Sequence, residues 1–155
     1  MKGNEKIIAV LNNLLADELT AISQYMVHSE MCASWKFEKL HKAIEERAIT
    51  EMKHAEKLIG RILFLDGIPI VSNLRKINIG ASVEAQFAND LDAELGAVKG
   101  YNEGIRVAYD LGDNGSRELL DSILPDEEEH VDWLEAQIGL VKLMSLKSYL
   151  VEQVG

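Results

Sequence analysis

Glu51-Met52-Lys53-His54 is the stretch that decides the fold, because its spacing of glutamate and histidine returns at Glu127-Glu128-Glu129-His130. Residues three apart on a helix lie on one face, one turn above the other. Each stretch therefore presents a carboxylate beside an imidazole. That pair of ligands suits a transition metal such as iron or zinc.

Two further glutamates keep a common register with these stretches. Glu18 lies 33 residues before Glu51, and Glu94 lies 33 residues before Glu127. The chain therefore contains the same half-site twice, and the repeat is a stronger signal than a single Glu-x-x-His motif.

Apolar residues repeat with helical spacing along most of the chain, which contains only two prolines. The pattern predicts an all-α fold with four long helices and a short fifth, at about residues 4–34, 37–65, 82–111, 116–144 and 145–154. One glutamate interrupts the apolar face of each long helix. A carboxylate there is costly unless it is paired or binds a metal.

Residues 66–82 contain Gly, Pro, Ser and Asn, and they predict a long crossover between the second and third helices. Such a segment can extend to roughly 55 Å, whereas a helix of about 28 residues is roughly 42 Å long. The crossover can therefore return along the whole bundle. We expect residues 1–155 to form a single domain.

Pro125 lies inside the fourth apolar pattern, where proline removes one helical hydrogen bond. The sequence predicts a kink or bulge at this position. The alternative is a fourth helix that begins near Pro125, but the apolar spacing on both sides argues against it.

The equal spacings predict that the two half-sites form one centre. The midpoint of each pair falls in a turn, at Ser34-Trp35 and at Asp110-Leu111, so each antiparallel hairpin brings a glutamate level with its Glu-x-x-His partner. Two hairpins facing each other then gather four carboxylates and two imidazoles in one core layer.

Two divalent cations cancel the four negative charges of this layer. Oxygen-rich ligation with one nitrogen per metal favours iron or manganese over a closed zinc site. Di-iron and di-manganese bundles carry this ligand pattern. The alternative is a set of salt-bridging surface residues.

The bulk properties limit the partners and the compartment. A formal net charge of −10 argues against a nucleic-acid partner and fits either a surface that attracts cations or an ordinary soluble acidic surface. Cys32 is the single cysteine, so it forms no disulfide within the chain and reads as a small apolar residue. The sequence has no signal-peptide pattern and no apolar run near the roughly 20 residues of a membrane span. We expect a cytoplasmic protein without a membrane partner.

Several stretches make the chain resemble the bacterioferritins over nearly its whole length. They are Leu15-Ala16-Asp17-Glu18-Leu19-Thr20-Ala21, Glu51-Met52-Lys53-His54-Ala55-Glu56, Asp92-Ala93-Glu94 and Asp126-Glu127-Glu128-Glu129-His130. The resemblance implies a homo-oligomeric shell of 24 subunits, built from twofold dimers, that stores iron as a ferric mineral. It also implies that residues 1–155 form a single ferritin-like four-helix-bundle domain, with a ferroxidase centre of two iron ions per subunit. In it Glu51 and Glu127 bridge the irons, while Glu18 with His54 and Glu94 with His130 are terminal ligands.

Met52 lies about 100° around the helix from Glu51 and so points away from the metal layer. It belongs to a second apolar strip that predicts a subunit interface and includes Leu19, Ile22, Met26, Ile49 and Ile59. The resemblance implies that Met52 is an axial ligand of a haem b shared by two subunits. The alternative is a methionine that packs in the interface.

Other positions depart from the family pattern or leave two readings open. A further iron site of some members uses a histidine and an aspartate, where this chain has Glu46 and Thr50, and a helix-two tyrosine is Leu58 here. Tyr25 and Trp133 are either electron donors or packing aromatics. The remaining histidines, His28 and His41, read as ordinary surface or hydrogen-bonding residues.

Three hypotheses follow for the function. The leading one is an iron-storage ferroxidase that uses dioxygen or peroxide, with a bacterioferritin-associated ferredoxin as a further partner. A rubrerythrin-like peroxidase would need a cysteine site that one cysteine cannot build. A nucleic-acid-protecting mini-ferritin places its iron site between subunits, whereas this chain supplies six ligands alone. A plain structural bundle is the remaining alternative.

Overall fold

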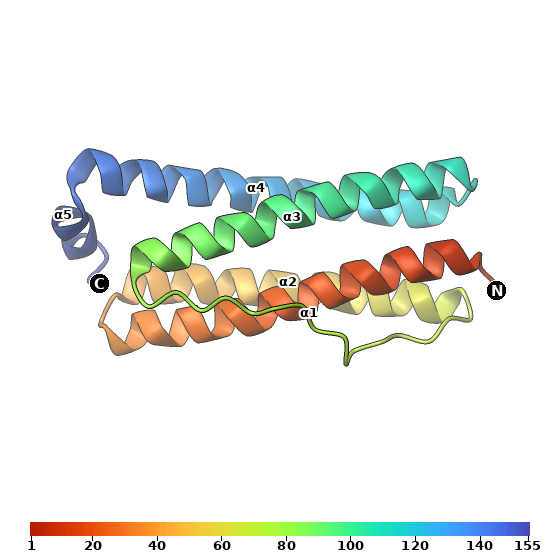
Figure 1. Ribbon diagram of the computed structural model, residues 1–155, viewed down its shortest axis with the longest axis horizontal. Coiled ribbons are helices and arrows are strands. Elements are labelled where there is room, and N and C mark those ends of the chain that lie inside the picture. Colours follow the sequence, from red (N-terminus) through yellow and green to blue (C-terminus); the bar gives the residue numbers. More distant parts are fainter.

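A computed structural model describes all 155 residues and confirms the all-α prediction. Four long helices form a bundle and a short helix crosses one end (Figure 1). The helices are α1 (Glu5–Ser34), α2 (Glu38–Phe64), α3 (Val83–Asp110), α4 (Asn114–Met144) and α5 (Leu146–Val151). No helix among the five is both long enough and apolar enough to cross a membrane. The bundle is thus two antiparallel hairpins, α1–α2 and α3–α4, joined by a long crossover.

Side-chain caps explain where the helices begin. The Asn4 side chain accepts a hydrogen bond from the Lys6 N–H, and Ser82 Oγ accepts one from Ala85, as its predicted capping role requires. Asp113 caps α4 in the same way, by accepting from the Ser116 N–H at 3.0 Å. The predicted start of the fourth helix, near Ser116, was therefore two residues late. Gly112 makes the preceding turn with a φ of 71°, a value glycine adopts without strain.

Helix α4 continues through Pro125. This excludes a fourth helix that begins near that residue. The apolar spacing on both sides was the correct guide, because packing of Leu120, Ile123 and Leu134 holds both halves of α4 against the bundle. The kink expected at Pro125 stays a prediction.

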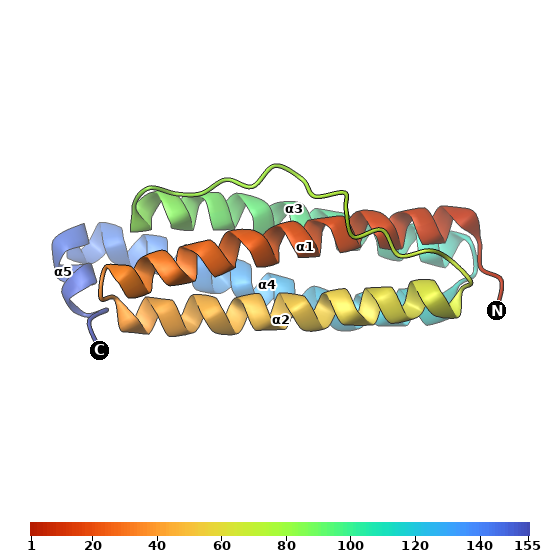
Figure 2. The same ribbon diagram turned by 90° about the horizontal axis from the view of Figure 1, so that it is seen from below.

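The crossover runs along the outside of α1 and α3 (Figure 2). A polar row on α1, with one residue per helical turn, accepts its backbone N–H groups. Thr20 Oγ1 accepts from Arg75 at 2.8 Å, Gln24 Oε1 from Asn78 at 3.0 Å, and His28 Nε2 from Gly80 at 2.9 Å. These bonds satisfy buried polar groups on both sides and fix the path of a segment that has no secondary structure.

His28 is fully buried, so the prediction of a surface residue was wrong and that of a hydrogen-bonding residue was right. Its Nδ1 lies 2.9 Å from Asp90 Oδ1, and the same oxygen accepts from Gln24. Since Nε2 accepts from Gly80, the ring is neutral with its proton on Nδ1. Sequence spacing missed this role because the partners belong to a loop and to another helix.

The apolar core is divided into two clusters by a polar layer at mid-bundle. One cluster occupies the end near the N-terminus and includes Ile7, Leu11, Leu58, Tyr101 and Leu120. The other lies at the α5 end and includes Tyr25, Leu40, Phe87, Leu134 and Tyr149. The residues between them on all four long helices are the glutamates and histidines of the repeated half-site. The core positions therefore frame the site.

Candidate metal centre

All four long helices contribute to one buried centre. Each of its six side chains is at most 7% exposed, so the alternative of salt-bridging surface residues is wrong. Their ligand atoms form two groups with atoms within 4.8 Å of one another, and Glu51 belongs to both groups. The first group is Glu18, Glu51, His54 and Glu127; the second is Glu51, Glu94 and His130. The predicted convergence of the two half-sites is confirmed as geometry.

His54 stands among the carboxylates of the first group. Its Nδ1 lies 3.1 Å from Glu51 Oε2, 3.0 Å from Glu127 Oε1 and 3.6 Å from Glu18 Oε2. On the other side of the ring, Nε2 lies 2.8 Å from Asp126 Oδ2. A carboxylate on the far nitrogen of a histidine orients the ring as a metal ligand would require. Asp126 was quoted only as part of a motif, and its contact depends on the fold.

Arg47 of α2 is a cationic side chain that lies against the carboxylates of the centre. Its Nε donates to Glu51 Oε1 at 2.8 Å, and its Nη2 donates to Glu127 Oε2 at 3.2 Å and lies 3.8 Å from Glu94 Oε2. The side chain is only 12% exposed. The spacing of four residues from Glu51 is a usable signal for the first contact, whereas the other two come from different helices.

Two tyrosines hold the remaining glutamates across the bundle. Tyr101 donates to Glu18 Oε1 at 2.5 Å, and Tyr25 donates to Glu94 Oε1. Burial, followed by the neighbouring carboxylates, raises the pKa of both hydroxyls well above the ordinary value. Both therefore keep the proton that they donate. Tyr25 also meets the His130 ring edge-on, so its packing role is present.

Burial and close contact divide the carboxylates into two kinds. Burial and the charge of Glu51 raise the pKa of Glu18, and burial with a hydrogen bond to Glu94 raises that of Glu127. Burial also acts to raise the pKa of Glu51, but hydrogen bonds with Glu18 and His54 outweigh it, so this pKa lies below its usual value. The carboxylates of the centre thus have pKa values shifted in opposite directions, as expected of interacting groups.

His54 carries a positive charge within this centre. Burial acts to lower its pKa, but hydrogen bonds with Glu18 and Glu51 outweigh burial and raise the pKa to about 10. The raised pKa values of Glu18, Glu127 and His54 and the charge of Arg47 all act against a build-up of buried negative charge.

Three buried atoms of the centre have no hydrogen-bond partner: Glu18 Oε2, Glu94 Oε2 and His130 Nδ1. Buried polar atoms without a hydrogen bond are rare in folded proteins. Charged neighbours lie within 4 Å of all three, the nearest being Glu94 Oε1 at 3.0 Å from His130 Nδ1. All three belong to side chains of the predicted ligand set, and they are two oxygens and one nitrogen. The residues therefore fit divalent metal ions with mixed oxygen and nitrogen ligation.

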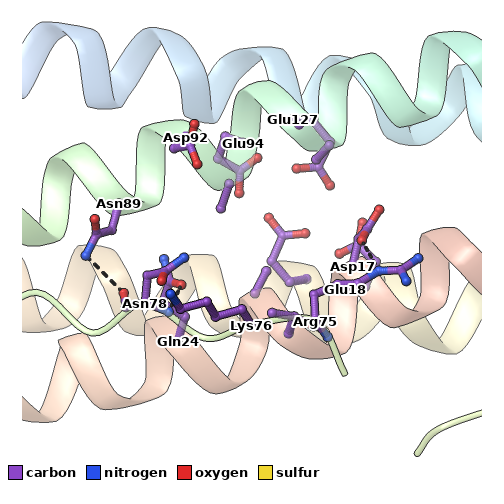
Figure 3. Close-up of a pocket in the computed structure, with 16 residues that line it drawn as sticks. Asp17, Glu18, Gln24, Arg75, Lys76, Asn78, Asn89, Asp92, Glu94 and Glu127 are labelled. Atoms are coloured by element: carbon purple, nitrogen blue, oxygen red, sulfur yellow. Dashed lines mark hydrogen bonds and ion pairs between the residues drawn. The ribbon is translucent and has the colours of Figure 1, made fainter. Parts of the chain in front are cut away.

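The centre is reached from two sides. A pocket of about 230 Å³ opens between α1, α3 and the crossover, with Glu18, Glu51, Glu94 and Glu127 among its lining residues. Figure 3 shows Glu94 and Glu127 projecting into this space from one hairpin and Glu18 from the other. A second pocket of about 270 Å³ lies on the α2–α4 side, where Arg47 and His130 line it.

The other residues singled out by sequence occupy varied places. Glu46 and Thr50 line the α2–α4 pocket, as does Trp133, whose ring stacks on that of His130. Leu58 is buried in the apolar core. His41 is partly buried, with Nδ1 2.9 Å from Ser29 Oγ, in accord with a hydrogen-bonding role. Cys32 is buried, as expected.

Met52 faces away from the centre, as predicted. It is 45% exposed, and Ile49 and Met26 beside it on the same apolar strip are 43% and 55% exposed. The strip therefore leaves a thioether and several aliphatic groups uncovered on the α1–α2 hairpin.

Comparison with known proteins agrees with this geometry. Residues 8–144 match the model of the ferritin-like domain. A bacterioferritin of Rhodobacter capsulatus is 44% identical over 90% of this chain and 87% of its own length. A bacterial ferritin of Synechocystis is 40% identical over the full length of both chains, and a bacterioferritin of Brucella melitensis is 38% identical over 96% of this chain and 92% of its own. The chain therefore belongs to the ferritin-like family and, within it, to the bacterioferritins.

Proposed function

We propose that this protein stores iron and oxidises Fe(II) to Fe(III) at a centre with two iron ions per subunit. The observation that carries the proposal is the buried layer of four glutamates and two histidines, in which three donor atoms have no hydrogen-bond partner. The names of the relatives support the storage of iron.

The two groups of ligand atoms support an assignment of roles. Glu51 belongs to both groups, which is what a bridging carboxylate requires. Glu127 belongs to the first group, where it contacts His54, and it also interacts with Glu94 of the second group. Glu18 with His54 would complete one subsite, and Glu94 with His130 the other. Bound iron supplies the electrons that reduce dioxygen or peroxide.

The protein contributes the placement of the ligands, the removal of water and the movement of protons. Tyr101 and Tyr25 fix one oxygen each of Glu18 and Glu94, which leaves the second oxygen of each carboxylate free to bind. The raised pKa values of Glu18, His54 and Glu127 mean that protons compete with metal ions for these groups. The pocket beside the crossover gives ferrous iron a path to the centre. Asp17 and Asp92 line it together with the basic residues Arg75 and Lys76, and Arg75 is paired with Asp17.

We also propose that 24 chains form the storage shell through twofold dimers that share a haem b, with Met52 of each chain as axial ligand. The exposed strip around Met52 supports both parts. Its aliphatic groups need a cover, and a thioether is a suitable haem ligand. The interface explanation and the haem explanation thus use the same face.

We place this function in the cytoplasm, because the single cysteine is buried and forms no disulfide in the chain. A bacterioferritin-associated ferredoxin is the proposed partner for returning electrons when iron is released, on the strength of the family resemblance.

Replacing a terminal glutamate tests the ferroxidase assignment. Glu18→Ala and Glu94→Ala each remove one ligand of a different subsite, so we expect ferrous oxidation in stopped flow to slow by about a hundredfold or more. The exposed Glu103→Ala on α3 is the matched control and should oxidise iron at the wild-type rate, and size-exclusion chromatography should show the same assembly for all. Wild-type oxidation in both ligand variants would exclude this centre as the ferroxidase.

A further inference from the structure

The two half-sites of the centre differ in two charged residues, of which one, Asp126, holds His54 and has Thr50 at its corresponding position. The other is the cationic Arg47. Arg47 lies four residues before Glu51, whereas the corresponding position four residues before Glu127 is the buried Ile123. The glutamates, histidines and tyrosines all occur in matched pairs, so Arg47 is the main departure from the pseudo-twofold arrangement. Its guanidinium therefore acts on one subsite more than on the other.

The contacts show which subsite that is. Arg47 reaches the two shared glutamates, Glu51 and Glu127, at 2.8 and 3.2 Å, and Glu94 at 3.8 Å. It makes no ion pair with Glu18. The guanidinium thus lies on the side of the centre that Glu94 and His130 define, where a second metal ion would bind.

The Glu18–His54 subsite has no fixed cation of this kind, because Arg47 makes ion pairs with Glu51, Glu94 and Glu127 only. Arginine keeps its charge in proteins and offers no lone pair, so it can become neither neutral nor a ligand. A cation approaching Glu94 and His130 would be repelled until the guanidinium moves.

The structure offers a place for the displaced side chain. Arg47 already lines the α2–α4 pocket of about 270 Å³, together with the carboxylates of Glu46, Asp126 and Glu129. Glu46 and Glu129 are exposed, so a guanidinium turned toward them exchanges buried carboxylates for solvated ones. The movement requires rotation of one side chain and no change in the helices.

We propose that Arg47 is a displaceable counter-ion of the Glu94–His130 subsite and that it orders metal binding. The Glu18–His54 subsite fills first. The second metal ion binds more weakly, because it must push the guanidinium out of the carboxylate layer into the α2–α4 pocket. The inference rests on the proposed di-iron function and adds to it an order of filling set by a residue that is not a ligand.

Zn²⁺, which is divalent and does not change oxidation state, provides a test without the oxidation reaction. Metal-stripped wild type should bind two equivalents per chain in two calorimetric steps. Arg47→Gln keeps a polar side chain but removes the competing charge, so its second step should tighten by about tenfold or more, with a smaller change in the first. Arg47→Lys keeps the charge and should retain the wild-type gap between the steps. Arg117→Ala, which breaks an exposed arginine–aspartate pair four residues apart, is the control.

The outcomes separate this inference from the function on which it rests. Two equivalents in both proteins, with an unchanged or weakened second step in Arg47→Gln, would overturn the counter-ion role and leave the di-metal centre intact. Failure of wild type to bind two equivalents would overturn the centre and the inference together. A Zn²⁺-loaded crystal structure adds an independent readout: we expect the guanidinium in the α2–α4 pocket, and its persistence against Glu94 and Glu127 would contradict the inference.

Discussion

Tyr101 of α3 donates a hydrogen bond to Glu18 of α1, and Tyr25 of α1 donates a hydrogen bond to Glu94 of α3. Each tyrosine lies seven residues after the glutamate of its own helix and bonds to the glutamate of the other. The carboxylate from each hairpin is therefore held by the opposite hairpin. The positions of the Glu18 and Glu94 carboxylates therefore depend on the packing of the α1–α2 hairpin against the α3–α4 hairpin.

Tyr101→Phe tests this cross-bundle bond. The variant removes a buried donor and leaves Glu18 Oε1 unpaired, so the unfolding free energy of the metal-stripped protein should fall by about 1–3 kcal/mol, measured by chemical denaturation. Ferrous oxidation should also slow, because the carboxylate loses its orientation. Tyr109→Phe, at a site 64% exposed, should change neither quantity. Equal stability of the two variants would show that the Tyr101 bond contributes nothing.

Metal binding should release protons and tighten as the pH rises. The pKa values of Glu18 and Glu127 are raised, and that of His54 is raised to about 10, so metal ligation competes with protonation of these groups. We expect Zn²⁺ titrations in buffers of different ionisation enthalpy to report more than one proton released per chain. Affinity should rise from pH 6 to pH 8. Binding that is independent of pH would contradict the assigned protonation.

His28→Ala should loosen the crossover without unfolding the bundle. The variant deprives the Gly80 N–H of its acceptor and Asp90 of one partner. Amide hydrogen exchange of residues 75–80 should therefore accelerate, while that of α2 and α4 stays slow. His41→Ala is the control, because His41 bonds within the α1–α2 hairpin. Unchanged exchange at Gly80 in the His28 variant would contradict the anchoring role.

Met52→Leu should separate the haem proposal from the ferroxidase. Leucine preserves the apolar strip but has no sulfur, so we expect loss of the haem Soret band with little change in ferrous oxidation. Met26→Leu, an exposed methionine on the same strip, should keep wild-type haem content. Equal Soret absorbance in the two variants would exclude Met52 as the axial ligand.

The sequence predicted the parts of the centre that depend on helical pitch alone. Equal spacings place Glu18 beside Glu51 and Glu94 beside Glu127 in any antiparallel pair of hairpins, and the turn at each midpoint sets the register. Contacts that depend on side-chain reach could not be predicted in this way. Asp126 of α4 contacts His54 of α2, and Arg47 of α2 pairs with Glu127 and Glu94 of the other hairpin. These contacts form only when the two hairpins pack together.

The crossover illustrates the same limit. Its existence follows from residues 66–82, but its path depends on acceptors from Thr20, Gln24 and His28, whose positions suit a loop that no periodicity describes. The start of α4 depended likewise on which acidic side chain folds back onto the chain, and Asp113 does so.

The division of the apolar core into two clusters has a mechanical consequence. In an ordinary bundle the middle of each helix is the most tightly packed part. Here the middle is a layer of charged side chains between two apolar clusters. The two apolar clusters can hold the helices together at both ends while the spacing of the ligand layer changes. Ions can therefore enter and leave a site on all four long helices without separating the helices. When metal ions fill the layer, they cross-link the α1–α2 hairpin to the α3–α4 hairpin.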